Sequence, residues 1–320
     1  MSDLRPVTLE EVRTARSRLD GLVLRTPLVR YAGTEAPAEI YLKLENLQPT
    51  GSFKLRAAGC ALLGADPREL SDGVWTASAG NMAQAVAWFA RRFGIACTAV
   101  VPDDAPAAKL DALRLLGARL EPRPFAEYQS IQRTHACPGM TGRLVHPFAD
   151  QAVMAGDATL ALEILEDLPD VEAIVVPYGG GGLSCGIAAA VHALAPQVKV
   201  LAAEAACGAP LTASLAAGRP VEVPFRTSFV SGIGAPFVFP EMWPLAGRLL
   251  DGAAAVSLEQ TAAAIRQLAL RNHVVAEGAG AVALASALAG NAGRGKVACL
   301  VSGGNLDPAK LVKILQGAVP

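Results

Sequence analysis

The sequence has none of the features that mark a secreted, membrane-spanning or nucleic-acid-binding protein. Its first residues, MSDLRPVTLEEVRTARSRLDG, are charged and lack the apolar core of a signal peptide. No apolar run approaches the roughly 20 residues of a membrane helix. The formal net charge of −1 gives no reason to expect nucleic acid or an anionic membrane as a partner. The six cysteines are scattered without a CxxC pair, so we expect them to be reduced and buried in a cytoplasmic protein.

The patterns of several common enzyme classes are also missing. The four histidines show no HExxH spacing, and no Ser-His-Asp pattern is built on a GxSxG segment, which disfavours metalloenzyme and hydrolase functions. No GxGxxG precedes an acidic residue at the dinucleotide spacing, and no glycine-rich loop ends in GK[ST]. A phosphate-binding loop in this chain would therefore serve a small phosphorylated ligand.

What the sequence does contain is an alternation of apolar strand segments and helical segments. Hydrophobic residues make up 52% of the chain and charged residues 18%, which is typical of a globular protein with a large core. GVWTASAG before NMAQAVAWFARRFG, and AIVVPYGGGG before LSCGIAAAVHALAP, each predict a strand, a turn and a helix. Strands that are apolar throughout lie in parallel sheets covered on both faces. We therefore expect an α/β protein with two three-layer domains.

Local signals add detail to this outline. Thr8 with Glu11, and Ser257 with Gln260, predict capping boxes at two helix starts. Residues 212–244 are rich in proline and glycine, and they predict a long excursion over the surface or the site.

Lysine is rare in the chain, and one of its seven lysines stands in an unusual place. In PTGSFKLRAAG, Lys54 follows Phe53 at the start of an alanine-rich helix, where the helix dipole disfavours a cation. Partial burial in this apolar neighbourhood would lower the pKa of the amine and free it for Schiff-base formation. Lys54 is therefore either a tolerated surface residue or a nucleophile.

Three further loops have the composition of ligand-binding turns. Gly179–Gly182 lie between an apolar strand and a helix, where exposed backbone N–H groups suit a phosphate. Ser78–Asn81 open another helix and offer N–H groups and an amide to a carboxylate, although an ordinary helix cap is the simpler explanation. Ser302 ends a late strand and is followed by two glycines, at a strand end where ligands bind in open α/β sheets.

An amine, a phosphate loop, a carboxylate loop and a hydroxyl beside a flat ligand are the groups that pyridoxal phosphate needs to act on an amino acid. In their order, TGSFKLRAA, SAGNMAQA, GGGGL and SGGN resemble the motifs of fold type II pyridoxal-phosphate enzymes, in the serine/threonine dehydratase and serine racemase branch. The resemblance covers nearly the whole chain. It implies a fold of the tryptophan synthase β type, with a small domain (48–142) inserted in a large one (1–47 and 143–320).

The resemblance also implies a role for each matching residue. Lys54 matches the Schiff-base lysine, Phe53 the residue that stacks below the pyridine ring, and Ser302 the partner of the pyridine nitrogen. The implied cofactor-binding residues are Phe53, Lys54, Asn81, Gly179, Gly180, Gly181, Gly182, Leu183 and Ser302. The implied substrate-binding residues are Ser78, Ala79, Gly80, Asn81 and Met82. Glu277 resembles a glutamate near the pyridine edge, although a first-turn glutamate favoured by the helix dipole explains it equally well.

Three departures from the family pattern distinguish this chain. Serine racemases have an acid/base serine where this chain has Ala79, so dehydration is favoured over racemisation. The family commonly has histidine where this chain has Met82, which changes the expected lining beside the carboxylate loop. Relatives with a divalent-metal site have an aspartate six positions after the glutamate that matches Glu204, and here that position is Pro210. We therefore expect no complete divalent site, with a monovalent ion near Glu204 as an alternative.

The sequence thus predicts a pyridoxal-phosphate-dependent ammonia-lyase that converts a β-hydroxy amino acid to a 2-oxo acid and ammonia. Threonine, serine, phenylserine and 3-hydroxyaspartate all stay open as substrates. A serine racemase and a non-catalytic binding protein on the same fold are the alternatives. The resemblance further implies a homodimer or homotetramer, and we expect no regulatory domain and no response to isoleucine.

Overall fold

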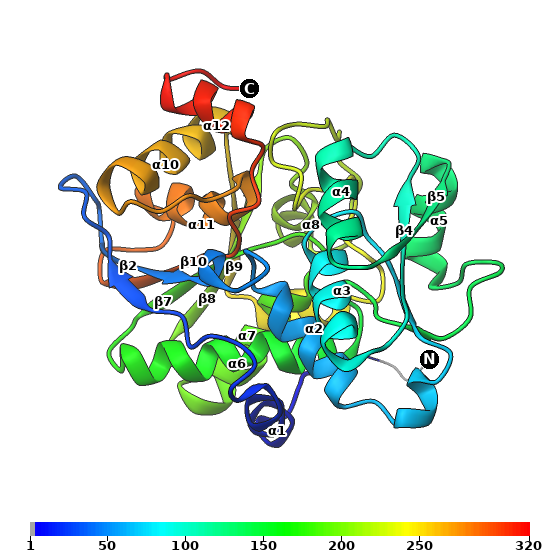
Figure 1. Ribbon diagram of the computed structural model, residues 1–320. Helices are drawn as coiled ribbons and strands as arrows, with labels where there is room; N and C mark the ends of the chain where they lie inside the picture. The colour runs from blue at the N-terminus through cyan, green and yellow to red at the C-terminus, as the bar shows by residue number, and fades with distance from the viewer. Residues whose placement is uncertain (1–3) are drawn as a thin grey trace.

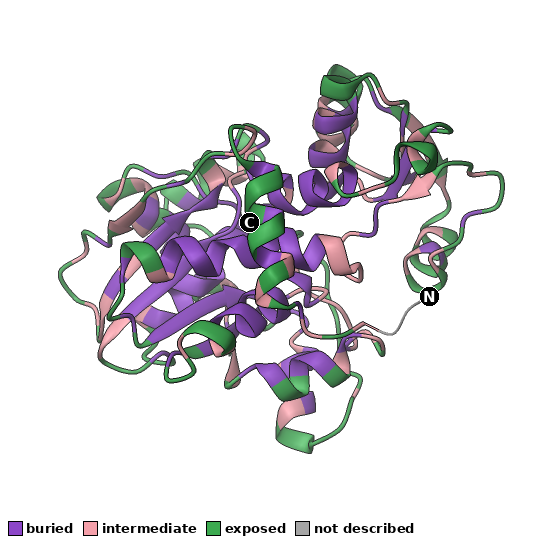
Figure 2. Cartoon of the chain, turned by 90° about the horizontal axis from the view of Figure 1, so that it is seen from below, coloured by how far each residue is buried: buried purple, intermediate pink, exposed green. Residues whose placement is uncertain are grey.

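The structure is a computed structural model that describes residues 4–320, and it contains two β-sheets, each flanked by helices. Figure 1 shows the two sheets side by side, with α2 (Lys54–Leu63) and α3 (Asn81–Phe93) between them. The central strands of both sheets and the helix faces packed on them are buried, while exposed residues gather on edge strands, outer helix faces and loops (Figure 2). The predicted α/β fold class is confirmed.

The larger sheet has six strands in the order β1-β2-β10-β7-β8-β9. Every neighbouring pair is parallel except β1 and β2 at one edge. The strands are β1 (Leu28–Arg30), β2 (Glu39–Leu44), β7 (Ala173–Pro177), β8 (Lys199–Ala205), β9 (Gly252–Val256) and β10 (Lys296–Val301).

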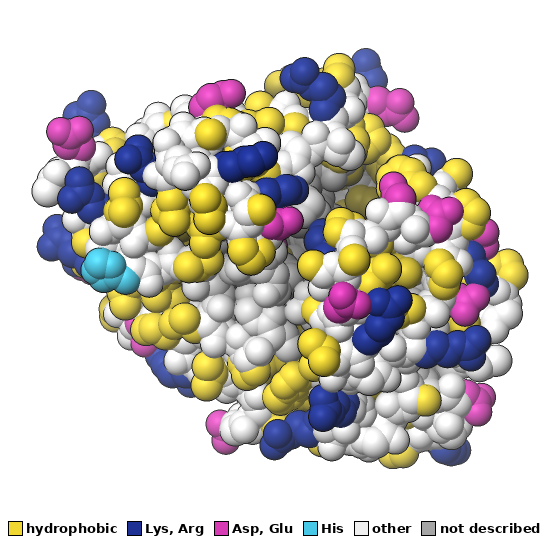
Figure 3. All heavy atoms as spheres, turned by 45° about the horizontal axis from the view of Figure 1, so that its top comes forward, with side chains coloured by type: hydrophobic (Ala, Val, Ile, Leu, Met, Phe, Trp, Pro, Cys, Tyr) yellow, Lys and Arg dark blue, Asp and Glu magenta, His cyan; other side chains and the backbone are white. Residues whose placement is uncertain are grey.

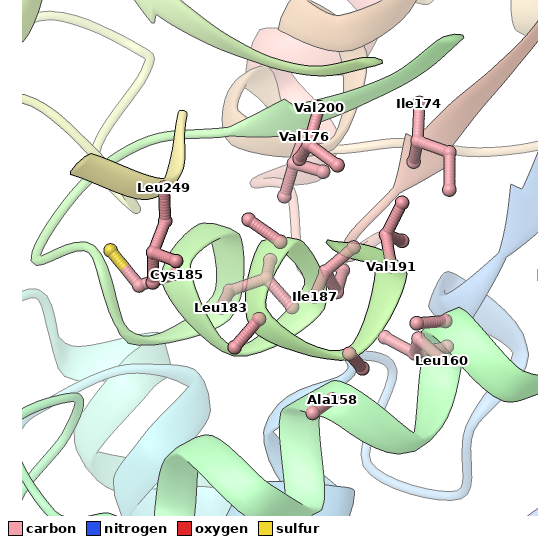
Figure 4. Packing of buried hydrophobic residues seen from close by; sticks show 14 of the residues in the cluster. Ala158, Leu160, Ile174, Val176, Leu183, Cys185, Ile187, Val191, Val200 and Leu249 are labelled. Atoms are coloured by element: carbon pink, nitrogen blue, oxygen red, sulfur yellow. The ribbon is translucent and has the colours of Figure 1, made fainter. Parts of the chain in front are cut away.

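Helices cover both faces of the larger sheet because its strands are apolar on both sides. Ile174 and Val176 of β7 point toward α7 (Figure 4), whereas Val175 belongs to the cluster under α11. On the first face lie α1 (Leu9–Leu19), α6 (Gln151–Asp167), α7 (Gly182–Leu194) and α9 (Trp243–Leu249). On the second lie α10 (Leu258–Arg271), α11 (Gly278–Leu288) and α12 (Pro308–Leu315).

The smaller sheet has four parallel strands in the order β5-β4-β3-β6. The strands are β3 (Val74–Ala77), β4 (Cys97–Pro102), β5 (Arg119–Arg123) and β6 (Arg143–Leu144). Helices α2, α3 and α4 (Ala107–Leu115) share one hydrophobic cluster with it, and α5 (Phe125–Thr134) packs on the other face. β6 pairs with β3, so this sheet extends just past the boundary at residue 142 that the sequence predicts for the small domain.

Several local predictions are confirmed. Both capping boxes are present, at Thr8 and at Ser257. All six cysteines are buried and unpaired. Of the predicted excursion 212–244, the ends belong to α8 (Pro210–Ala217) and α9, and residues 218–242 between them contain no helix or strand. Within residues 4–320, none of the helices combines the length and the apolar character needed to cross a bilayer.

Candidate active site

Two segments some 250 positions apart lie side by side at the carboxyl end of β10. The Phe53 N–H donates to the carbonyl oxygen of Ser302 over 3.0 Å, and Ser52 forms an isolated antiparallel bridge with Gly303. This pairing fixes the first residue of α2, Lys54, next to the strand end that carries the Ser302 hydroxyl. The structure therefore brings together two of the motifs that the sequence predicts to share a site.

The Lys54 amine occupies a partly buried position at the start of α2. Its Nζ donates to the backbone oxygen of Pro147 and lies 4.6 Å from the centroid of the Phe53 ring. Burial lowers the pKa of Lys54, and the Asp157 carboxylate partly opposes this shift. A lowered pKa increases the fraction of neutral amine, which is the nucleophilic form.

The glycine loop connects β7 to α7 and has room only for glycine at several positions. A Cβ at Gly180 would lie 2.2 Å from the Phe148 ring, and one at Gly182 would lie 2.6 Å from the Phe148 carbonyl oxygen. Gly181 has a φ of 95°, which other residues rarely adopt. α7 begins at Gly182 with no side-chain cap, so its first N–H groups are left for an anion.

Leu183 is the last residue of the predicted phosphate loop, and unlike the glycines it has a side chain that is buried in the core. Its side chain is buried in the core cluster beneath the larger sheet, as Figure 4 shows. Its contribution to a phosphate site would thus come from its backbone, held in place by packing.

The predicted carboxylate loop joins β3 to α3. The Gly80 N–H donates to Ser78 Oγ over 3.2 Å, and α3 begins at Asn81 without a side-chain cap. The Ala79 methyl packs against the small-domain cluster. Met82 is only 2% exposed and its side chain belongs to the same cluster, so any contact with a substrate carboxylate would come from its backbone N–H at the start of α3.

Asn81 and Glu277 meet across the two sheets. Asn81 Nδ2 donates to Glu277 Oε1 over 2.6 Å, and Asn305 Nδ2 donates to Asn81 Oδ1 over 2.8 Å. Burial raises the pKa of Glu277 to about 7, although the Asn81 hydrogen bond acts in the opposite direction. Glu277 is therefore a direct partner of a predicted cofactor residue and more than a helix-start glutamate.

Glu204 is used for a structural purpose in this fold. Its Oε1 accepts from the Leu211 N–H over 3.0 Å, and its Oε2 accepts from the Thr212 N–H over 2.7 Å and from Thr212 Oγ1 over 2.6 Å. These bonds satisfy N–H groups at the start of α8. In the described part of the chain, no cluster of three or more His, Cys, Asp or Glu side chains is arranged to hold a metal ion.

The sequence contains one literal GxSxG, GLSCG at 182–186, which overlaps the glycine loop. Its serine, Ser184, is fully buried within α7, and Ser184 Oγ donates to the Gly181 carbonyl oxygen over 3.2 Å. A nucleophile needs an exposed hydroxyl with a base beside it. This segment is therefore part of the phosphate loop and gives no support to a hydrolase.

Sequence reasoning missed the segment His146–Phe148, which supports both Lys54 and the glycine loop. His146 Nδ1 accepts from the Ala149 N–H over 2.8 Å, and burial lowers the pKa of His146 to about 3. The ring is thus a neutral acceptor that shapes this turn. The sequence does contain a His-Pro-Phe segment shortly after the predicted end of the small domain at residue 142. Only the packing in the structure shows which atoms this segment supports.

The residues present fit pyridoxal phosphate. The glycine cradle leaves backbone N–H groups free beside an uncapped helix start, and the amine at Lys54 is held in the same region by the pairing with the Ser302 segment. Figure 3 shows a hollow between the two halves of the molecule, where much of the surface is backbone or side chains that are neither hydrophobic nor charged. Such a surface allows close approach of a flat, phosphorylated ligand.

Comparison with known proteins decides the family. A family model described as "Pyridoxal-phosphate dependent enzyme" matches residues 19–303. The chain belongs to this family. The cofactor predicted from the sequence is therefore confirmed as pyridoxal phosphate.

Relatives of this pyridoxal-phosphate-dependent chain extend over nearly its whole length. An L-threonine ammonia-lyase of Thermotoga maritima is 41% identical over 317 residues, which cover 97% of this chain and 78% of the relative. Maize serine racemase superposes with a TM-score of 0.86 at 29% identity, covering 98% of each chain. The serine racemase of Dictyostelium discoideum superposes with a TM-score of 0.82 at 32% identity, covering 94% of this chain and 99% of that one.

Proposed function

We propose that this protein is an ammonia-lyase that converts a β-hydroxy amino acid, L-threonine or L-serine, to a 2-oxo acid and ammonia. The observation that carries the proposal is the partly buried Lys54 amine, with its lowered pKa, in a site that also contains an uncapped glycine loop. The ammonia-lyase names of relatives such as the Thermotoga maritima protein support it. When bound, pyridoxal phosphate supplies an electron sink conjugated to the substrate Cα.

Each group of the chain has a task in this proposal. Lys54 would hold the cofactor through its Nζ, and the same amine would take the Cα proton of the substrate. The glycine loop binds phosphate through its N–H groups, and the start of α3 binds the substrate carboxylate. Asn81 would help to hold the bound cofactor, and Glu277 keeps the Asn81 amide in place.

Ala79 is the feature that favours elimination over racemisation. A racemase needs a proton donor on the face opposite the lysine, and the Ala79 methyl has no proton to give. In this chain the Ala79 side chain packs against the hydrophobic cluster of the smaller sheet. The Ala79→Ser variant tests this point, because it should gain measurable racemisation of L-serine while keeping elimination.

Ser302 favours elimination for an electronic reason. A neutral hydroxyl does not hold a proton on the pyridine nitrogen as a carboxylate would, so the ring is a weaker electron sink and prompt loss of the β-hydroxyl is favoured. Ser302 is buried at the end of β10, where its environment is protected from solvent. Ser302→Asp should therefore slow elimination relative to the formation of side products. An unchanged ratio of elimination to side products would show that Ser302 does not favour elimination.

The central experiment has two parts on the purified protein. A yellow absorption band that disappears on borohydride reduction, with mass spectrometry placing the reduced adduct on Lys54, tests the cofactor site. A panel of threonine, serine, phenylserine and 3-hydroxyaspartate, read as 2-oxo acid and ammonia, tests the reaction. An adduct on another lysine would overturn the site, and an adduct on Lys54 without any ammonia release would leave a binding protein.

We further propose a cytoplasmic location and a homodimer or homotetramer, as composition and resemblance imply. Residues 48–142 with β6 form the smaller domain in this proposal, and the remainder forms the larger one. Light scattering after size-exclusion chromatography tests the assembly, and limited proteolysis between the two sheets tests the division into domains.

A further inference from the structure

Helix α6 carries a carboxyl group that the proposed reaction leaves unexplained. Asp157 is 0% exposed, and within the described residues neither of its carboxyl oxygens has a hydrogen-bond partner. An ionised carboxylate in such a place is strongly unfavourable unless a cation is near, and a neutral carboxylic acid is tolerated far better. The side chain therefore needs either a proton or a positive neighbour.

Asp157 lies where α6 touches the helix that carries the site lysine. A Cβ on the adjacent Gly156 would lie 2.4 Å from the backbone oxygen of Arg56 and 2.8 Å from Cys60 Cβ. The two helix backbones are thus in contact over the first two turns of α2, which begins at Lys54. Asp157, the residue after Gly156, is fully buried beside this contact.

The charges around Asp157 leave Lys54 as its positive neighbour. The titratable groups that face it are Lys54, Glu45, Arg56 and Cys60. Arg56 already pairs with Glu45 at 2.9 Å and with Glu163 at 2.6 Å. Burial raises the pKa of the Cys60 thiol to about 11, so it stays neutral. Over residues 4–320, Lys54 is the cation of this group that forms no ion pair.

We propose that Asp157 is a positioning residue that sets the protonation state of the Lys54 amine. When Lys54 Nζ is an ammonium group, Asp157 is its carboxylate counter-charge. When Nζ releases a proton, the carboxyl binds one, so the buried pair stays neutral overall. No hydrogen bond joins the two groups, and the coupling acts through the low-dielectric interior.

The directions of the two titrations agree with this coupling. Burial raises the pKa of Asp157 to about 7, and Lys54 opposes that shift. Burial lowers the pKa of Lys54, and Asp157 opposes that shift in turn. The inference rests on the proposed role of Lys54 as the residue that holds the cofactor and moves the Cα proton, because that role requires an amine that gains and loses a proton readily.

The test reads the amine itself in the full-length chain freed of cofactor. Competitive labelling with acetic anhydride across pH, followed by peptide mass spectrometry, gives the midpoint at which Lys54 becomes reactive. Asp157→Asn keeps the shape and removes the charge, so the Lys54 midpoint should fall by about one pH unit or more. Glu204→Gln is the matched control, because it changes a buried carboxylate that caps α8 and should leave the midpoint in place.

A midpoint that is equal in wild type and in folded Asp157→Asn would overturn the proposal, as would an equal shift in Glu204→Gln. If Asp157→Asn fails to fold, carbon-13 NMR of aspartate-labelled wild type takes its place. One carboxyl should titrate near pH 7, and its midpoint should rise further in Lys54→Gln; no such rise contradicts the pairing. The labelling experiment needs neither cofactor nor substrate, so a negative result would not contradict the proposed ammonia-lyase reaction. Likewise, absence of ammonia release would not contradict the coupling between Asp157 and Lys54.

Discussion

Arg56 and Lys54 lie two positions apart on α2, but Arg56 is fully ion-paired whereas Lys54 forms no ion pair among the residues that the structure describes. The Arg56 guanidinium is buried and forms ion pairs with Glu45 and Glu163. It also donates to Thr159 Oγ1 over 3.2 Å. The Lys54 amine has one backbone oxygen as its acceptor, and burial lowers its pKa.

The difference separates a charge that holds the fold together from one that is kept available for chemistry. A buried ionic network with every member paired makes the arrangement rigid and fixes one packing of the helices. A buried amine with few partners has a perturbed pKa, and such groups gather at functional sites. One helix therefore joins α6 firmly through Arg56 and presents a reactive group at its first residue.

Replacing Lys54 with Ala should produce the largest functional effect. We expect ammonia release to fall about 10³-fold or more, because the covalent cofactor anchor and the Cα base are lost together. Initial rates with L-threonine and L-serine measure the loss. The free energy of unfolding should change far less than in an Arg56 variant, and a comparable destabilisation would show that Lys54 is mainly structural.

Replacing Arg56 with Met should produce the largest loss of stability. Glu45 and Glu163 would stay buried without their shared cation, and breaking such a network destabilises a protein by about 3–5 kcal/mol. Urea unfolding measures this change. Arg68→Ala is the control, since Arg68 is 90% exposed in its pair with Asp66 and should matter by less than about 0.5 kcal/mol.

Much of the site could be predicted from the sequence because its parts are local. A glycine run after an apolar strand, or a lysine after an aromatic residue at a helix start, is visible within a few letters. The burial of the Met82 side chain was not predicted, because a single position does not show which face of α3 points into the core. The partners of Lys54, Pro147 and Asp157, come from distant positions and were not predicted.

Helix α6 shows why parts of the fold also escaped prediction. Residues 153–164 are buried on every side, so the helix has no polar face and gives no amphipathic pattern. It lies between α1, α2 and α7, and only this tertiary setting explains its apolar surface. In the sequence, Asp157 looks like a polar residue that interrupts an apolar run, and nothing indicates that its carboxyl is buried.

Glu277→Gln should have an intermediate effect that is visible in the pH profile. The pKa of Glu277 is raised to about 7, so above that pH the group is a carboxylate that accepts strongly from Asn81. We expect wild-type activity to rise with pH through about 7, and the variant to lose this limb and run about tenfold slower at pH 8. A pH profile of kcat/KM measures it, and an unchanged limb would assign the titration to another group.

Asp157→Asn should have the smallest effect, on stability and in a defined pH window. The folded carboxyl titrates near 7 and the unfolded one near 3.8, so between these values the unfolded chain ionises first and the native state loses stability as pH rises. Asparagine does not titrate, so the variant should gain stability relative to the cofactor-free wild type as the pH rises from about 4 to 7. Urea unfolding at three pH values measures this slope. Asp103→Asn, at an exposed position, should show a flat difference. If the stability difference between Asp157→Asn and wild type also stays constant with pH, the Asp157 carboxyl is paired as fully as the carboxylates that bind Arg56.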